Sequence, residues 1–269
     1  MPAFRLITFN LLNDRSRWAQ RRLLVVDQFA ALQPDLIALQ EVTPTPDNNA
    51  QWLADRLGGY HVSYCPFHGE KRDREGIAIL SRWPIHQAHS IELATQSRVA
   101  HSIEISFPTR TLIVATTHLH WWPGESSERD RQAQQIIGWL KPFVVDHAVI
   151  VCGDFNGVPD TRAIRLMRDH FSSAFALVHG HEPEYTCPTP LTVGTIRTAR
   201  DVWRTIRRKV VAMAANNPFK PWRGTLDYIF VNQHVRVSDC QVVLNQPAPD
   251  DARLYPSDHF GLMAEIEVI

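Results

Sequence analysis

The sequence lacks the features that mark several specialised classes of protein. It carries no net charge, since 28 Lys and Arg residues balance 28 Asp and Glu residues. This balance argues against binding of nucleic acid through the overall charge of the protein, though not against a local basic patch. The four cysteines include no Cys-x-x-Cys pair, so they favour a reducing, cytoplasmic location over a zinc site or a disulfide framework. We expect no secretory signal and no transmembrane segment, because no apolar run approaches ~18 residues.

What is present is the composition of an ordinary globular protein. Hydrophobic residues make up 44% of the chain and charged residues 21%, which excludes a disordered or fibrous protein. The length of 269 residues is enough to bury a sizeable core, and one α/β domain can reach this size. We expect a single domain over residues 1–269, present as a monomer.

The order of apolar runs indicates a mixed α/β protein. Apolar residues at helical spacing predict helices over 18–32, 48–57, 126–140 and 160–169. Short apolar runs predict strands over 4–9, 35–40, 60–64, 76–81, 85–92, 99–107, 111–117, 148–152, 226–231, 235–244 and 260–268. Helices separate only some of these strands, so several neighbouring strands must pair antiparallel, unlike a Rossmann fold or a TIM barrel. Two sheets with helices outside them would accommodate this pattern.

One segment, residues 191–223, interrupts the pattern. It holds eight basic residues and one acidic residue, Asp201; the basic residues are Arg197, Arg200, Arg204, Arg207, Arg208, Lys209, Lys220 and Arg223. Two interpretations stay open. The segment is either a solvated helix packed on the body of the protein, or an insertion that recruits an anionic substrate or surface.

Polar residues recur where the predicted strands end. Strand ends that face one rim can bring distant residues into one pocket, and such rims are common ligand sites. Each residue alone is more often a cap or a turn former than a catalyst, but their joint occurrence in this order favours a functional site. These residues are Asn10, Glu41, His118, Asp154, Asn156, Asp227, Asp258 and His259.

The motifs around these residues resemble those of the endonuclease/exonuclease/phosphatase superfamily, which includes deoxyribonucleases, deadenylases, sphingomyelinases and inositol-phosphate 5-phosphatases. They span almost the entire chain and are TFN (8–10), LQEV (39–42), EGIAILSR (75–82), THLHW (117–121), GDFN (153–156), LDYIFV (226–231) and SDH (257–259). The resemblance implies a four-layer α/β/β/α sandwich of two mixed, mainly antiparallel sheets. It also implies a metal-dependent hydrolase of phosphoester bonds.

The resemblance implies a Mg²⁺ cofactor, with Mn²⁺ as a substitute. Glu41 supplies a hard oxygen ligand of the kind that Mg²⁺ prefers. Asp258 is expected as a second ligand, and Asn10 is expected to contact the metal or a phosphate oxygen. Some family members carry an acid two residues after this asparagine, where this chain has Leu12, so we predict one main metal site.

The remaining motif residues are expected to act on the water and the phosphate. Asp154 resembles the residue that orients or deprotonates the attacking water, and Asn156 would hold this water or a phosphate oxygen. His259 would contact the scissile phosphate, with Asp227 fixing its tautomer and favouring its charged form. His118 matches the family members that have histidine here, and it would donate to a phosphate oxygen or the leaving group.

Four further residues are candidates for substrate binding. Glu75 would pair with His118, as an acid does in deoxyribonuclease-like members. Trp121 and Trp122 would stack on a base or cover an apolar leaving group, although one of them would serve equally well as a core residue. Arg131 would buttress the site, and a solvent-exposed helix position explains it equally well.

The substrate is less well defined than the reaction. A nuclease acting on nucleic acid or nucleotides, with segment 191–223 as a phosphate track, is the first hypothesis. A sphingomyelinase-like or inositol-phosphate-type enzyme acting on lipid or sugar phosphates is the second, with the same segment on an anionic membrane surface. A catalytically silent binding module is the third, and it is disfavoured because every expected catalytic position holds a competent side chain.

Overall fold

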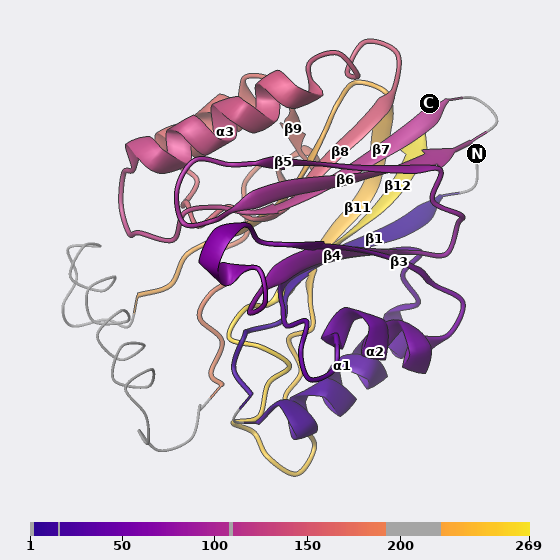
Figure 1. Ribbon diagram of the computed structural model, residues 1–269, viewed down its shortest axis with the longest axis vertical. Helices are drawn as coiled ribbons and strands as arrows, with labels where there is room; N and C mark the ends of the chain where they lie inside the picture. Colours follow the sequence, from indigo (N-terminus) through magenta and orange to yellow (C-terminus); the bar gives the residue numbers. More distant parts are fainter. Residues whose placement is uncertain (1–2, 16, 108–109, 192–221) are drawn as a thin grey trace.

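The computed structural model describes residues 3–15, 17–107, 110–191 and 222–269 (Figure 1). Most of the basic segment 191–223 therefore lies outside the described residues. Its predicted role in recruiting an anionic surface or substrate stays a prediction.

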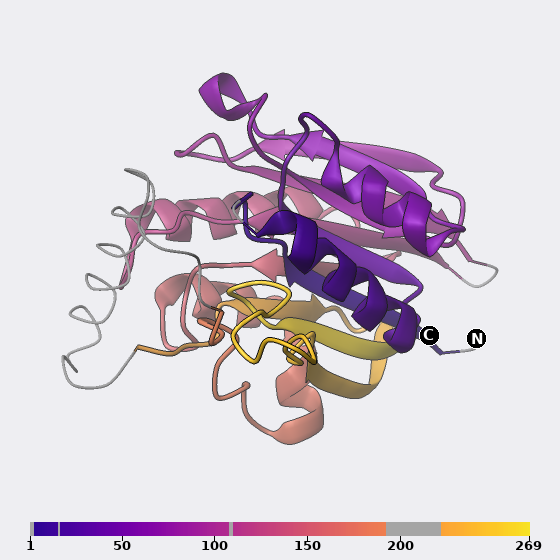
Figure 2. The same cartoon turned by 90° about the horizontal axis from the view of Figure 1, so that it is seen from below.

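The first sheet has six strands. Its neighbouring strands pair antiparallel except for β1 and β2, which are parallel. Its strand order is β11 (Val235–Val243), β12 (Gly261–Val268), β1 (Phe4–Asn10), β2 (Leu36–Val42), β4 (Gly76–Ser81) and β3 (His61–Pro66). The start of β1 and the end of β12 lie at the same end of the molecule (Figure 2).

The second sheet repeats this arrangement, with β7 and β8 as its parallel pair. Its strand order is β5 (Gln87–Glu92), β6 (Val99–Ser106), β7 (Thr111–His118), β8 (Ala148–Asp154), β10 (Asp227–Val231) and β9 (Ser172–Ser173).

Helices cover the outer face of each sheet. The first sheet packs on α1 (Trp18–Leu32) and α2 (Asn49–Leu57), and the second on α3 (Ser127–Leu140) and α4 (Arg162–Arg168). Figure 1 shows α1 and α2 on the side of the sheets opposite α3. Two short helices complete the described elements, the 3-10 turn η1 (Gly69–Lys71) and α5 (Ala174–His179).

The main core lies between the two sheets. The inward-facing side chains are apolar and fully buried, among them Leu6, Leu36, Val114 and Ile150. Separate apolar layers lie between each sheet and its helices. Four layers thus bury three apolar interfaces, and the predicted α/β/β/α sandwich of two mixed, mainly antiparallel sheets is confirmed.

Polar side chains join the two sheets below the rim. The Gln40 amide on β2 donates hydrogen bonds to Thr8 Oγ1 on β1 (3.1 Å) and to Thr116 Oγ1 on β7 (3.0 Å). Gln40 and both threonines are fully buried, where an unsatisfied polar group would cost about 1–3 kcal/mol. This cross-sheet bond fixes the two parallel pairs relative to each other, immediately beneath the candidate site.

Candidate functional site

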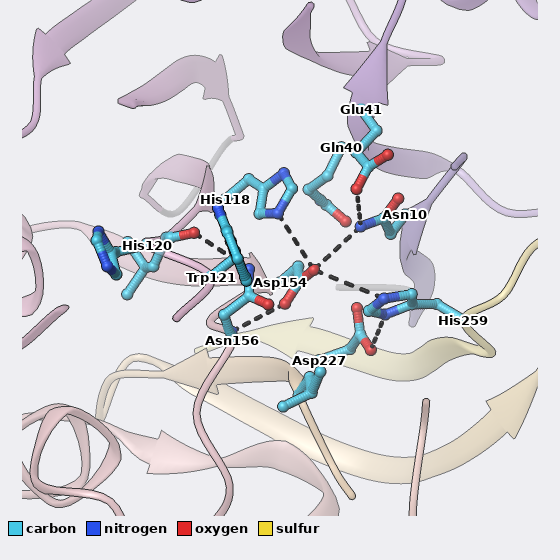
Figure 3. Close-up of polar contacts among 12 residues, drawn as sticks. Asn10, Gln40, Glu41, His118, His120, Trp121, Asp154, Asn156, Asp227 and His259 are labelled. Carbon is cyan, nitrogen blue, oxygen red and sulfur yellow. Dashed lines mark hydrogen bonds and ion pairs between the residues drawn. The ribbon is translucent and has the colours of Figure 1, made fainter. Parts of the chain in front are cut away.

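The predicted residues gather at one rim because of how the strands are paired. The carboxyl ends of β1 and β2 and those of β7 and β8 lie at this rim, and they carry Asn10, Glu41, His118 and Asp154. The antiparallel strand β10 starts at the same rim, and its Asp227 pairs with Asp154. Figure 3 shows these side chains converging from both sheets.

Asp154 lies at the centre of this group, with only 1% of its surface exposed. Its Oδ2 accepts a hydrogen bond from the Asn10 side-chain amide (3.0 Å) and lies 3.4 Å from His118 Nε2 and 3.8 Å from His259 Nε2. Its Oδ1 accepts from the Asn156 backbone N–H (2.9 Å). Burial is the main cause that raises the pKa of Asp154 to about 6; His259 opposes this shift and Asp227 adds to it.

His259 and Asp227 form a buried pair. His259 Nδ1 lies 2.9 Å from Asp227 Oδ2, which turns Nε2 toward Asp154. Burial alone would lower the pKa of His259, but Cys187, Asp227 and Asp154 together hold it well above its usual value. These acidic neighbours therefore favour the charged form of the imidazole.

The segment before the basic region holds this pair in place. The Thr186 hydroxyl accepts hydrogen bonds from the backbone N–H groups of Leu226 (3.0 Å) and Asp227 (3.3 Å). The Thr186 carbonyl accepts from the N–H of Phe260 (2.7 Å). One buried threonine thus fixes the backbone next to both members of the pair.

Asn156 adopts a left-handed backbone with φ 49°. Its side-chain amide donates to the Leu119 carbonyl (3.1 Å), and its backbone N–H bonds to Asp154 as described above. Asparagine tolerates this backbone conformation better than most residues. The turn after β8 thus places Asn156 beside Asp154 and ties it to the end of β7.

Glu41 lies on the opposite side of the site, where the pairing of β2 with β4 shifts register. Its backbone is left-handed (φ 56°), an uncommon conformation for a residue with a Cβ atom that often marks functional positions. Glu41 Oε2 accepts from the Asn13 backbone N–H (2.6 Å), and Oε1 accepts from the Asn10 amide (3.3 Å). The carboxylate is thus oriented by donors, and it offers hard oxygen atoms that fit a divalent cation such as Mg²⁺.

Asn10 connects the two carboxylates through one nitrogen atom. Its Nδ2 donates to both Glu41 and Asp154, while its Oδ1 accepts from the Leu12 backbone N–H (2.9 Å). In this arrangement Asn10 sets the positions of the two carboxylates, while its oxygen is held by the backbone of Leu12.

Glu75 joins Glu41 and His118, as the sequence predicts for its pairing with histidine. Glu75 Oε1 lies 3.7 Å from His118 Nδ1 and 3.5 Å from the Arg98 guanidinium. Glu41, Glu75 and His118 offer ligand atoms that lie within 4.8 Å of one another. Burial raises the pKa of Glu75, Arg98 lowers it and Glu41 raises it further. A cation beside these two carboxylates would relieve their mutual repulsion, so the donor set suits a metal.

Asp258 is partly exposed next to His259. Its backbone carbonyl accepts from the Thr189 N–H (2.9 Å), and its Oδ1 accepts from the Ser257 hydroxyl (3.4 Å). These contacts fix its backbone. They leave its predicted metal contact as a prediction.

Trp121 and Trp122 lie on the loop that follows β7, with their ring centres 5.3 Å apart. Trp121 is half-buried, whereas 52% of Trp122 is exposed. Neither belongs to the apolar core layers described above. Both rings are therefore placed where a substrate group could contact them.

The residue that supports this loop is Arg129, which the sequence analysis missed. Arg131 lies on the exposed side of α3, whereas Arg129 is 1% exposed. The Arg129 guanidinium donates to the carbonyls of His120 (3.2 Å), Trp122 (2.8 Å) and Gly124. The support that was predicted for Arg131 is thus provided by its neighbour two residues earlier.

Lys71, Arg98 and Asn13 were also missed. Asn13 lies in a loop, Arg98 lies just before a strand, and Lys71 ends the 3-10 turn η1. No spacing pattern distinguishes any of them from a solvated surface residue. A composition signal was present only for Lys71, which lies in the charged run from Glu70 to Glu75.

This fold, with a rim of carboxylates and histidines that suits a metal, is the arrangement expected of the superfamily that the motifs resemble. The chain belongs to the Endonuclease/Exonuclease/phosphatase family, whose model matches residues 7–259. The family and the fold that the motifs predict are confirmed.

Several characterised proteins are similar to the chain over almost its whole length. Nocturnin of Drosophila melanogaster is 26% identical over 94% of this chain and 42% of its own length, and Nocturnin of Rattus norvegicus is 26% identical over 93% and 58%. The chain thus spans about half the length of these relatives.

Solved structures share the fold. The human Nocturnin catalytic domain with bound sulfate has a TM-score of 0.72 at 23% identity, covering 100% of this chain and 94% of that one. The D. rerio TDP2 structure with a single-strand DNA product has a TM-score of 0.75 at 18% identity, covering 99% of each chain. Among the described residues, no helix is both long enough and apolar enough to cross a membrane.

Proposed function

We propose that the chain is a Mg²⁺-dependent phosphodiesterase of the nuclease type, in which Asp154 activates the attacking water. The observation that carries this proposal is the environment of Asp154. A buried carboxylate with a pKa of about 6 is held between one amide and two imidazoles. A general base is most effective when its pKa lies near the working pH.

The residues around Asp154 orient its carboxylate and bind the water and the phosphate. Asn10 and the Asn156 backbone each donate to Asp154 and fix its orientation, and the Asn156 side chain holds the water or a phosphate oxygen. The charged His259 presents its Nε2 hydrogen toward the same space and binds the scissile phosphate, while Asp227 fixes its tautomer. His118 donates to a phosphate oxygen or to the leaving group, and Glu75 lies 3.7 Å behind its Nδ1.

Glu41 is the primary metal ligand in this proposal, with Asp258 as a second ligand and Asn10 at the edge of the site. The metal is Mg²⁺, with Mn²⁺ as a substitute, because the donors are hard carboxylate oxygens. Such an ion, when bound, lowers the charge repulsion between the phosphate and the carboxylates of the site.

Nucleic acid or a nucleotide is the favoured substrate. Trp121 and Trp122 follow His118 closely in the chain and offer surfaces on which a base could stack. A structural relative holds a single-strand DNA product, and one sequence relative is named as a 2',5'-phosphodiesterase. Both names support cleavage of a phosphodiester bond. Lipid or sugar phosphates are the competing outcome.

A cytoplasmic location and a monomeric state complete the proposal. All four cysteines are free thiols, and three of them are buried. This usage suits a reducing compartment, where disulfides are rare.

An activity panel tests the function. It contains bis(p-nitrophenyl) phosphate, single- and double-stranded DNA, RNA, a nucleotide set and sphingomyelin, each with Mg²⁺, Mn²⁺ or EDTA. Asp154→Asn is the inactive variant, and Asp160→Asn is the control because Asp160 is exposed. Metal-dependent cleavage of nucleic acid or nucleotides that only Asp154→Asn loses supports the proposal. Cleavage of sphingomyelin alone would replace the substrate, and full activity in EDTA would overturn the metal dependence.

A further inference from the structure

Helix α1 carries a buried arginine, Arg21, on its inner face. The buried residues of this helix are Arg21, Val25 and Phe29, which are spaced four apart and therefore share one face. Only 1% of Arg21 is exposed, although arginine is seldom fully buried unless its donors are paired. The chemistry proposed above gives this side chain no role.

The Arg21 guanidinium donates four hydrogen bonds to backbone carbonyls. Three acceptors lie on the loop after β1, where Nη1 donates to Leu11 (2.8 Å) and Nη2 to Leu12 (3.1 Å) and Asp14 (2.7 Å). The fourth acceptor is the Pro256 carbonyl, at 2.8 Å from Nη1. One side chain thus connects two segments from opposite ends of the chain.

The loop after β1 orients the carboxylate that is proposed to bind the metal. The Asn13 backbone N–H donates to Glu41 Oε2 (2.6 Å), and the Leu12 N–H donates to Asn10 Oδ1 (2.9 Å). Leu12 has a left-handed backbone (φ 60°), which persists at such a residue only where the surroundings hold it. Arg21 binds the carbonyls on both sides of Asn13 and so holds this loop in its shape.

The Pro256 carbonyl lies directly before the segment that carries Asp258 and His259. Within this segment the His259 N–H donates to Ser257 Oγ (3.3 Å). A displacement of Pro256 would therefore be passed on to the residues proposed to bind the metal and the phosphate. Arg21 fixes the start of this segment relative to the loop after β1.

We propose that Arg21 is a positioning residue that holds these two segments of the site together, so that Glu41 and Asp258 can serve one cation. This inference rests on the proposed function and adds to it a residue that touches neither metal nor substrate. Arg21 acts through the backbone of both segments.

The shape of the guanidinium suits this role. Its donors lie in one plane and point in fixed directions, so they can bind several carbonyls at once, whereas a lysine ammonium is a point charge on a flexible stem. The guanidinium also lies 5.3 Å from the ring centre of Trp18, one turn earlier on the same helix. Lysine at this position would keep the charge and lose part of the connection between the segments.

Hydrogen exchange tests the connection without metal or turnover. In Arg21→Lys, measured in EDTA, the N–H groups of Asn13 and His259 should both exchange about tenfold faster than in the wild-type protein, as expected when a local hydrogen bond is lost. The N–H groups of β8 should keep their rates. A uniform acceleration over all elements would make Arg21 a residue of general stability and would overturn the proposal.

Arg22→Lys is the matched control for this measurement. Arg22 is the next residue of α1, and its guanidinium lies over the Trp52 ring of α2, 4.5 Å from the ring centre. The same substitution there should leave the exchange of Asn13 and His259 unchanged. Equal acceleration in both variants would contradict a specific role for Arg21.

Metal binding tests the consequence for the site. The probe is Mn²⁺, whose free ion is quantified by electron paramagnetic resonance at a temperature at which circular dichroism shows each variant to be folded. Arg21→Lys and Arg21→Met should bind Mn²⁺ about 10–100-fold more weakly than the wild-type protein, the usual effect of removing a group that orients metal ligands. Arg22→Met should bind it with wild-type affinity.

The two measurements separate this inference from the proposed function. If the wild-type protein binds no Mn²⁺ but both segments loosen in Arg21→Lys, the metal proposal fails and the connecting role of Arg21 stands. Equal Mn²⁺ affinity in the wild-type protein and both Arg21 variants would refute the positioning role alone. If neither Arg21 variant folds, Arg21 is a structural residue only, and the proposal is also overturned.

Discussion

His118 and Asp154 face each other because they are paired residues at the ends of the parallel strands β7 and β8. Their side chains meet at 3.4 Å, between His118 Nε2 and Asp154 Oδ2. If one of the two strands slipped by one residue, its side chain would turn to the opposite face of the sheet and the pair would separate. The apolar residues of both strands, which are fixed between the two sheets, therefore also set this contact.

Asp154→Asn should remove the base while it preserves the shape of the side chain. We expect kcat to fall by about 10²–10⁴-fold, the usual contribution of a general base. Because the pKa of Asp154 is raised to about 6, its ionised form opposes folding at neutral pH, so the variant should melt at the same temperature or higher in EDTA. Kinetics and thermal melts of the same samples check both effects. A collapse of the melting temperature would assign Asp154 a structural role.

Glu41→Gln should abolish the response to Mg²⁺. A cation that binds only the folded state raises the melting temperature as its concentration rises, and Glu41 supplies the oriented carboxylate for this binding. Melting curves across a Mg²⁺ series should shift for the wild-type protein and stay constant for Glu41→Gln. An equal shift in both proteins would place the cation elsewhere.

Arg129→Met should destabilise the protein by about 2–4 kcal/mol, because three loop carbonyls lose a buried donor. Arg131→Ala is the matched comparison on the same helix. Arg131 is exposed, so its loss should change the free energy of unfolding by less than about 0.5 kcal/mol. Urea denaturation of both variants measures the difference, and a raised KM in Arg131→Ala alone would restore the substrate role predicted for Arg131.

His101 should make the protein sensitive to acid. Burial lowers its pKa to about 4 in the folded state, whereas the unfolded chain takes up this proton near its usual pKa of about 6.5. The unfolded state thus binds more protons between these two values, and stability is lost as pH falls from about 6.5 to 4, by up to about 3 kcal/mol. His101→Gln, which can keep a hydrogen bond to Ser63, should flatten this slope in urea titrations. His61→Gln, at an exposed position, should not.

The strand ends that form the site and the four layers of the fold could be predicted from the sequence, because the patterns that indicate them are local. Helix α1 spans the predicted residues 18–32, where helical spacing ends before a proline, and the strands that carry Asp154 and Asp227 follow from apolar runs. Helix α5 was not predicted, because its six residues are too few to show a period. Strand β2 continues past the predicted end at Gln40 to Val42, because a register shift accommodates Glu41 within the sheet.

Tertiary packing, and not the local sequence pattern, decides which charged residues support the site. Arg129 and Arg131 are two positions apart on a helix, so they point about 200° apart and only one can face the loop. The sequence alone does not distinguish them. The same holds for Arg98, whose importance rests on Glu75, a partner 23 residues away.

Two carboxylates of the site belong to different sheets, Glu41 to the first and Asp154 to the second. Their separation is therefore set by the thickness of the apolar layer between the sheets, which the Gln40 hydrogen bonds to β1 and β7 span beneath the site. A methyl group added to or removed from that layer, such as at Val114 or Leu36, alters this spacing from a distance. Substitutions in this apolar layer, far from any bound substrate, should then change the alignment of Glu41 with Asp154. Activity should also decline on warming at temperatures below the unfolding transition.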